Sequence, residues 1–475
     1  MASHSLDYFL FLYLAAFVYW LVARWSHLRL AWLLFASCAF YMAWQPAYVL
    51  LILGSTLLDF SAGLCMAKTK RVAVKKAWLV TSLIGNLGLL FSFKYFNFVS
   101  QQLFPILNSW GLPGSPPLFD VLLPIGISFY TFQTMSYTID VYRGAIQPTR
   151  SLLQFACFVT YFPQLVAGPI VRATELLPQL AQRPTINRQQ VGQALFLLGL
   201  GLTKKIAIAD YLSVNLVDRV FDQPAAYSAA EVCLGLYGFT MQIYCDFSGY
   251  TDLARGSAML MGIRLPENFD RPYWASNPAE FWRRWHMTLS SWLRDYLYFP
   301  LGGSRGSPLR TYVNLWLTIF LIGIWHGASW TFVLYGSLQA TAVALHRLWF
   351  RYRQRQGRSA STHGLNHVLK VFLCLQFIVL SRILFRAKDL TEAKEVGLRL
   401  LDTSWGSMHQ LSWSLWLVLG GSFMLHYLPK SWTQRAESML IACPIAIQLS
   451  LLIVLAFALS LIANSQTVPY IYFQF

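Results

Sequence analysis

Apolar runs long enough to cross a lipid bilayer make up most of this chain, and they limit its fold more than any other feature. A helix needs about 20 residues to cross roughly 30 Å of hydrocarbon. Runs near that length lie at residues 6–23, 28–44, 46–66, 77–96, 118–142, 151–171, 190–213, 228–250, 310–328, 329–350, 366–385, 411–428 and 440–463. We therefore predict an all-α polytopic membrane protein, one multi-pass domain over residues 1–475, with on the order of ten or more transmembrane helices.

Two of these runs are poorly suited to a simple span. LVAGPI (165–170) follows Pro163, and LLPIGISFY (122–130) carries both proline and glycine. Irregular backbone survives at membrane depth only where protein or a water-filled cavity surrounds it. We therefore expect broken or re-entrant helices at these places, and a cavity beside them.

The composition agrees with a membrane protein and argues against a nucleic-acid partner. The chain is 56% hydrophobic and 12% charged, against about 25% charged residues in soluble domains. Its net charge of +17 comes largely from short basic loops, at 24–29, 68–76 and 346–358. Basic loops between spans set the orientation in the membrane and bind anionic lipid. The first two clusters are expected in the cytoplasm, with the N-terminus outside.

Residues 264–306 differ from the apolar runs because they combine many charges with many aromatic residues. Asn277, Pro278 and Glu280 have the positions of an N-cap, a first-turn proline and a capping-box glutamate. We predict one interfacial helix from there to PLGG (300–303). Its apolar face would hold Phe281, Trp285, Leu289, Trp292, Tyr296 and Phe299, and its polar face Glu280, Arg283, Arg284, Ser291, Arg294 and Asp295. Two interpretations are open: a surface anchor with an incidental His286, or a helix at a cavity mouth whose arginines bind a phosphate-bearing donor.

A single histidine, His326, lies in the apolar stretch IFLIGIWHGASWTFVLYG (319–336). No Asp, Glu, Lys or Arg occurs between Arg310 and Arg347. An ionisable residue inside the membrane indicates function by default, although a hydrogen bond to a helix carbonyl is the structural alternative. Burial keeps an imidazole neutral and able to accept a proton. We predict that His326 is a general base.

Other polar residues in apolar runs are better explained by structure. Asp246 has no charged partner nearby in the sequence and is expected to meet a basic residue of another helix, whereas Asp252 and Arg255 are spaced as a local ion pair. Asp59 has no explanation from the sequence. No metal is expected, because the histidines lack HxxxH or HExxH spacing and the seven cysteines lack a CxxC pair. No GxSxG motif indicates a serine nucleophile.

Several stretches resemble the membrane-bound O-acyltransferase superfamily, in particular its branch of alginate O-acetylation proteins. They are YCDFSGYTDLARG (244–256), LPENFDRPYWASNPAEFWRRWHMTLSSWLRDYLYFPLGGSR (265–305), IWHGASWTFVLYG (324–336), LVAGPI (165–170) and PYIYFQF (469–475). The resemblance extends over most of the chain, with the catalytic motifs at about 240–336. It implies a helical membrane enzyme with a central tunnel, which moves an acetyl group across the bacterial inner membrane for O-acetylation of an exported polysaccharide such as alginate.

The resemblance also implies roles for individual residues. His326 of WHG matches the essential histidine of the family, and His286 of RRWHMTLS matches its second motif position. The implied acyl donor is acetyl-CoA, and the implied partners are membrane lipid, a separate periplasmic acetyltransferase and the polysaccharide acceptor. We predict that the donor phosphates are bound by Arg283, Arg284, Arg294 and Arg305, with Lys204 and Lys205 as further candidates. We predict that Asp246, Tyr250, Asn268, Trp285 and Trp325 line the substrate channel.

Other functions are compatible with the same residues. The acyl group or acceptor could differ, as in cellulose acetylation or D-alanylation of teichoic acid. In a proton-coupled transporter or polysaccharide export channel, His326 would be a proton relay, but such proteins normally have chains of intramembrane acids and bases and often inverted repeats. A scaffold of a secretion complex would leave His326 replaceable. The sequence selects neither the polysaccharide nor an acyl-enzyme intermediate.

Overall fold

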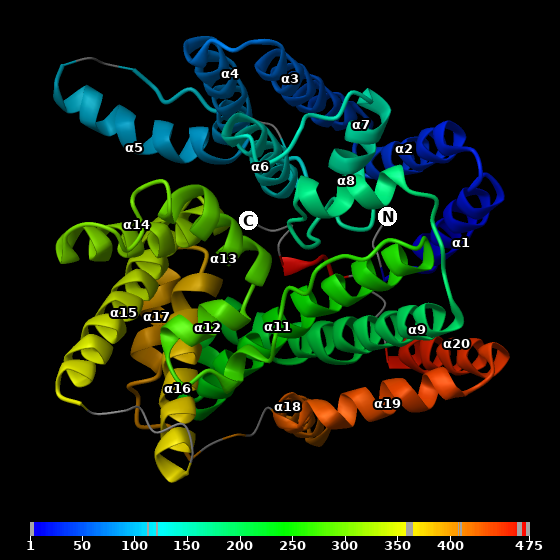
Figure 1. The fold of residues 1–475 in the computed structure, drawn as a ribbon. Helices are drawn as coiled ribbons and strands as arrows, with labels where there is room; N and C mark the ends of the chain where they lie inside the picture. The colour runs from blue at the N-terminus through cyan, green and yellow to red at the C-terminus, as the bar shows by residue number, and fades with distance from the viewer. Residues whose placement is uncertain are drawn as a thin grey trace. The chain divides into compact units, whose positions relative to one another are not determined.

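The computed structural model describes residues 4–111, 114–119, 122–357, 364–406, 408, 411–462 and 468–471. Within these ranges the regular elements are helices (Figure 1). No strand is assigned there, which confirms the predicted all-α class. The contacts divide the chain into two compact units, Met1–Val191 with Ala254–Pro266, and Gly192–Leu253 with Glu267–Phe475. The single membrane domain stays a prediction.

The first unit is built from the N-terminal helices, drawn in blue to cyan-green in Figure 1. They are α1 (Leu6–Leu21), α2 (Ser26–Met42), α3 (Val49–Lys68), α4 (Val72–Leu90), α5 (Phe96–Ser109), α6 (Ile127–Arg143), α7 (Leu152–Thr160) and α8 (Ala173–Ala181). Between α7 and α8 the backbone is irregular, which confirms that LVAGPI is not a simple helical span. The predicted cavity beside it stays a prediction.

Asp59, which the sequence left unexplained, is held by a buried polar network in this unit. Its side chain is fully buried on α3. Asn86 of α4 donates to both carboxylate oxygens at 3.0 and 2.9 Å, and the hydroxyl of Ser82 donates to one of them. Thr134 of α6 donates in turn to Asn86, at 3.1 Å. Buried polar groups need such partners, so Asp59 ties three helices together.

The second unit contains most of the predicted catalytic region, including His286 and His326. Its helices are α9 (Arg188–Leu202, whose first residues belong to the first unit), α10 (Asp218–Asp222), α11 (Ala229–Leu260, whose last residues belong to the first unit), α12 (Pro278–Arg284), α13 (Met287–Leu293), α14 (Pro308–His326), α15 (Trp330–Arg355), α16 (Leu365–Arg386), α17 (Leu390–Arg399), α18 (Trp413–Tyr427), α19 (Lys430–Ala442) and α20 (Ile445–Ile462).

Within the described residues, five segments are long and apolar enough to cross a membrane: Pro46–Lys68, Val72–Ser109, Arg188–Asp222, Leu365–Arg386 and Ile445–Ile462. The protein is a multi-pass membrane protein.

Helices α14 and α15 form a close antiparallel hairpin in this unit. A Cβ atom on Gly323 of α14 would collide with the backbone of Gly336 of α15, so only glycine permits the helices to come this close. Small residues allow such close packing of membrane helices. Because α14 ends at His326, this contact fixes the end of the helix that carries the histidine.

Candidate active site

The segment predicted as one interfacial helix is two short helices with a break at His286. The predicted start is confirmed: Asn277 caps α12 and accepts a hydrogen bond from the Glu280 N–H at 2.9 Å, with Pro278 in the first turn. The predicted continuity is wrong, because Trp285 is extended and His286 has a left-handed φ of 44°. A non-glycine residue rarely adopts this conformation, so the turn brings the His286 ring to a position that a straight helix would not provide.

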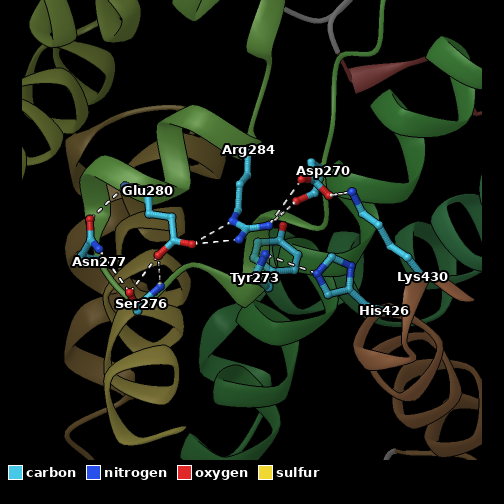
Figure 2. Close-up of polar contacts among 8 residues, drawn as sticks. All are labelled: Asp270, Tyr273, Ser276, Asn277, Glu280, Arg284, His426 and Lys430. Carbon is cyan, nitrogen blue, oxygen red and sulfur yellow. Dashed lines mark hydrogen bonds and ion pairs between the residues drawn. The ribbon is translucent and has the colours of Figure 1, made fainter. Parts of the chain in front are cut away.

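A chain of ion pairs holds α12 in place (Figure 2). Arg284 lies between Glu280, at 2.9 Å, and Asp270, at 3.5 Å, and Lys430 reaches Asp270 from α19 at 2.6 Å. Glu280 also accepts from the N–H and hydroxyl of Ser276, at 2.9 and 2.8 Å. Burial acts to raise the pKa of Glu280, but the hydrogen bonds from Ser276 and Arg284 outweigh it and hold the pKa below its ordinary value. Arg284 is therefore engaged in fixing the helix.

His286 is fully buried and its ring is held by the start of α13. Its Nδ1 lies 3.2 Å from Oδ1 of Asn268 and 3.4 Å from the N–H of Leu289. A protonated Nδ1 can donate to Asn268, and an unprotonated Nδ1 can accept from Leu289. Asn268 is itself fixed, because its Oδ1 accepts from the N–H and the hydroxyl of Thr288 at 3.2 and 2.9 Å. The ring therefore has a partner in either tautomer.

His326 is buried at the C-terminal end of α14, with 2% of its surface exposed. Its Nδ1 lies 2.6 Å from the carbonyl oxygen of Ile322, one turn earlier. A carbonyl can only accept, so Nδ1 carries the proton and the lone pair of the neutral ring is on Nε2. The structural alternative, a hydrogen bond to a helix carbonyl, is therefore present on Nδ1. The role of Nε2 as a general base stays a prediction.

The structure brings the two histidines into one aromatic cluster. The ring of Trp325 lies 5.7 Å from the His286 ring and 5.1 Å from the His326 ring, measured between centroids. Phe247 of α11 packs against His286 at 4.8 Å, and Phe385 of α16 against His326 at 5.1 Å. Burial lowers the pKa of His286 well below its ordinary value, and the nearby His326 ring lowers it further. His286 is therefore neutral at physiological pH.

The arginines predicted to bind donor phosphates do not form one cluster with these rings. Arg283, Arg294 and Arg305 are exposed. Arg294 pairs with Asp295 at 2.7 Å, and Arg284 is paired as described above. Exposed arginines remain able to attract an anionic ligand to the protein surface, so their role in binding stays a prediction.

The two candidate lysines already have carboxylate partners. Lys204 lies 2.6 Å from Asp252, so Asp252 pairs with a lysine of another helix, whereas the sequence predicted Arg255. Lys205 is fully buried and lies 2.8 Å from Asp246 and 2.7 Å from Asp210. The expectation that Asp246 meets a basic residue of another helix is confirmed.

The same ion pair anchors the C-terminal segment that carries PYIYFQF. Lys205 donates to the carbonyl of Val468 at 3.0 Å, and the second oxygen of Asp246 accepts from the N–H of Ile471 at 2.8 Å. Tyr470 packs on Tyr250 of α11, with centroids 5.1 Å apart. These contacts give Asp246 and Tyr250 a structural task, and their place in a substrate channel stays a prediction. The rest of the motif, residues 472–475, lies outside the described residues.

Two buried residues of this unit were missed by sequence reasoning. His426 of α18 accepts the N–H of Tyr273 through Nε2 at 3.2 Å (Figure 2). Arg382 of α16 is completely buried, and its guanidinium lies 5.0 Å from the ring of Trp285 and 5.4 Å from that of Phe385. A signal for Arg382 was present, since it interrupts an apolar run predicted to cross the membrane. Among the described residues no group of three or more His, Cys, Asp or Glu is placed to hold a metal ion.

Comparison with known proteins assigns the chain to a family. The family model described as MBOAT, membrane-bound O-acyltransferase family, matches residues 74–385. The chain is 40% identical over 391 residues to the protein named probable alginate O-acetylase AlgI of Pseudomonas aeruginosa, covering 82% of this chain and 73% of that protein. It is 34% identical over 398 residues to a peptidoglycan O-acetyltransferase of Helicobacter pylori, covering 77% and 72%. A teichoic acid D-alanyltransferase of Bacillus subtilis is 25% identical over 291 residues, covering 58% and 71%. The resemblance seen in the sequence is thus confirmed: the chain is an O-acyltransferase and belongs to the membrane-bound O-acyltransferase family.

Proposed function

We propose that this enzyme transfers acetyl groups from acetyl-CoA, supplied in the cytoplasm, for O-acetylation of an exported polysaccharide such as alginate. The relatives with the highest identities quoted above are named for acetyl transfer to alginate and to peptidoglycan, and both of these acceptors are glycans with free hydroxyl groups. The teichoic acid relative is named for a D-alanyl group, at lower identity. The site is proposed to lie in the bacterial inner membrane, where a cytoplasmic donor and an exported acceptor meet.

One observation carries the chemistry: the hydrogen bond from Nδ1 of His326 to Ile322, which leaves the base on Nε2. The acceptor hydroxyl gives its proton to Nε2 while its oxygen attacks the thioester carbonyl carbon. The tetrahedral oxyanion then collapses, the C–S bond breaks, and the imidazolium returns the proton to the leaving sulfur. The products are the O-acetyl ester and CoA thiol.

His286, whose ring also contacts Trp325, is proposed to assist this step. Its ring is neutral, buried and held by Asn268 and Leu289. A neutral imidazole can donate one hydrogen bond to a carbonyl oxygen, which stabilises the charge that develops there. The break after α12 is what places this ring beside the Trp325 that also contacts His326.

We propose two kinds of partner for this enzyme. A separate periplasmic acetyltransferase would pass the acetyl group to the final polysaccharide, and membrane lipid would surround the spans. The exposed Arg283, Arg294 and Arg305 are proposed to guide the acidic acetyl-CoA toward the site.

His326→Ala tests the central claim. We expect loss of about 1,000-fold or more in acetyl transfer, since the variant lacks the base and general base catalysis alone contributes about 10²–10⁴-fold. The measurement is the acetyl content of the extracellular polysaccharide, together with acetyl-CoA consumption by purified enzyme in detergent. The equivalent change at His346, a half-buried histidine of α15, is the matched control. Full acetylation in His326→Ala would refute the proposal, and lost polymer export with retained acetylation would favour the transporter.

A further inference from the structure

Arg382 is a fully buried cation in the next-to-last turn of an apolar helix. It lies on α16, one of the segments able to cross a membrane, and has no exposed surface. Arginine remains charged in proteins at all physiological pH values. A charge in such a place is costly, and it is found where it pairs with another group or serves function.

No carboxylate compensates this charge within the described part of the chain. None of its guanidinium nitrogens Nε, Nη1 and Nη2 has a hydrogen bond of good geometry there. The next arginine on the same helix behaves differently, because Arg386 lies 2.9 Å from the carboxylate of Asp218. Removal of one partner of a buried ion pair normally leaves a strongly destabilising charge, whereas in the described structure the native neighbours of Arg382 are neutral aromatic rings and phenol groups.

Aromatic side chains surround the guanidinium. Trp285 and Phe385 lie below 6 Å from it, within the range of a cation–π contact. The hydroxyl oxygens of Tyr273 and Tyr335 also lie near the guanidinium, as neutral hydrogen-bond acceptors. All four aromatic residues are at most 2% exposed. We call these four side chains, Trp285, Phe385, Tyr273 and Tyr335, the aromatic cage. The cage tolerates a cation, but an anionic oxygen would accept hydrogen bonds from the guanidinium more strongly than these neutral groups do.

The cage is continuous with the histidine site. Trp285 is the residue before His286, and Phe385 packs on His326 with ring centroids 5.1 Å apart. Phe385 also contacts Phe332 and Tyr335 of α15, at 5.3 and 5.1 Å. Arg382 therefore contacts Trp285, which is covalently bonded to His286, and Phe385, which packs on His326.

We propose that Arg382 binds an anionic oxygen of the reacting ligands during acyl transfer. This inference rests on the proposed function and extends it to a positive charge that complements the two neutral imidazoles. The anionic oxygen has two sources. It is either the oxyanion that forms on the thioester carbonyl during attack, or a standing carboxylate or phosphate of donor or acceptor. A guanidinium suits both, because it presents several N–H donors in one plane.

The test compares Arg382→Lys and Arg382→Met with wild type and with Arg386→Lys as the matched control on α16. Initial rates of acetyl-CoA consumption by the purified full chain are measured against acetyl-CoA concentration, with the Tm of each protein in the same detergent. We expect Arg382→Met to lose about 100-fold or more, the effect of removing one oxyanion donor, with an unchanged or raised Tm. A purely structural arginine would instead lower the Tm.

The kinetic pattern identifies the source of the anion. A fall in kcat at unchanged KM indicates the transition-state oxyanion, and a rise in KM indicates a standing anion. Where Arg382→Met does not fold, Arg382→Lys decides, because it keeps the charge but not the planar donors. A rate within threefold of wild type in a folded Arg382 variant would overturn the inference.

His326→Ala, measured beside them, separates the two proposals. An inactive His326→Ala together with a fully active Arg382→Lys refutes only the role of Arg382. Full activity in His326→Ala refutes the proposed function itself.

Discussion

Two fully buried cations of the same unit, Lys205 and Arg382, have opposite surroundings. Lys205 has two carboxylates and a backbone carbonyl within 3.0 Å. Arg382 has aromatic rings, and no carboxylate in the described part of the chain. A buried charge that is paired with opposite charges belongs to the structure that holds the pair. A buried charge without such a pair is more often found at a site where a ligand supplies the opposite charge. The difference predicts that Lys205 contributes to stability and Arg382 to rate.

The strongest way to break this comparison is Lys205→Met. The variant leaves Asp246 and Asp210 buried without their cation, so we expect a loss of about 3–5 kcal/mol in the free energy of unfolding. Thermal unfolding in detergent, with the yield of folded protein, measures it. The double variant Lys205→Met with Asp246→Asn removes one stranded charge and should recover part of the loss. A stable Lys205→Met protein would show that the pair does not hold the unit together.

Asn268→Ala should have an intermediate effect on both stability and rate. It strands the N–H and hydroxyl of Thr288 and removes one of the two partners of the His286 Nδ1. We expect a destabilisation of about 1–3 kcal/mol and a lower kcat at unchanged KM for acetyl-CoA. Asn268→Asp keeps the acceptor oxygens and is the matched comparison. Unchanged kinetics in Asn268→Ala would remove His286 from the transfer step.

The smallest effect is expected at the edge of the site, from Glu280→Gln. The pKa of Glu280 is lowered in the folded protein, so this carboxylate stabilises the fold above its unfolded pKa near 4.3. That contribution disappears as the pH falls through the lower folded value. Because the pair with Arg284 is partly exposed, we expect at most about 1 kcal/mol at neutral pH. Tm measured from pH 7 to pH 3 should fall less steeply in Glu280→Gln, and equal slopes would contradict this account.

Local patterns in the sequence predicted the helices, and they failed where distant residues meet. Apolar runs and the Asn277 cap predicted the all-α class and the start of α12 correctly, because periodicity and capping depend on neighbours along the chain. The break at His286 was not predicted, because a left-handed φ is usually indicated by glycine and this position is a histidine. Asp252 lies 48 residues from Lys204, and Asp246 lies 41 residues from Lys205. No local sequence pattern pairs residues so far apart.

The sequence predicted the two histidines of the candidate site but not the buried arginine beside them. His326 was conspicuous because its stretch contains no Asp, Glu, Lys, Arg or second histidine, and the family motif added His286. Arg382 was not predicted as a site residue. It interrupts a predicted span, but apolar residues on both sides of it continue the run. Only the folded structure shows that this arginine contacts Trp285 and Phe385.

The contacts of Lys205 have a consequence for the biosynthesis of the protein. Its hydrogen-bond acceptor Val468 is 263 residues further along the chain, which a ribosome adding about 5–20 residues per second reaches on the order of tens of seconds later. Throughout that interval the span Arg188–Asp222 must carry a lysine without its final neighbours. Asp210 is part of the same span and already lies 2.7 Å from Lys205 in the folded protein. The lysine thus enters the membrane with a counter-ion from its own span, and Asp246 and Val468 join this pair later.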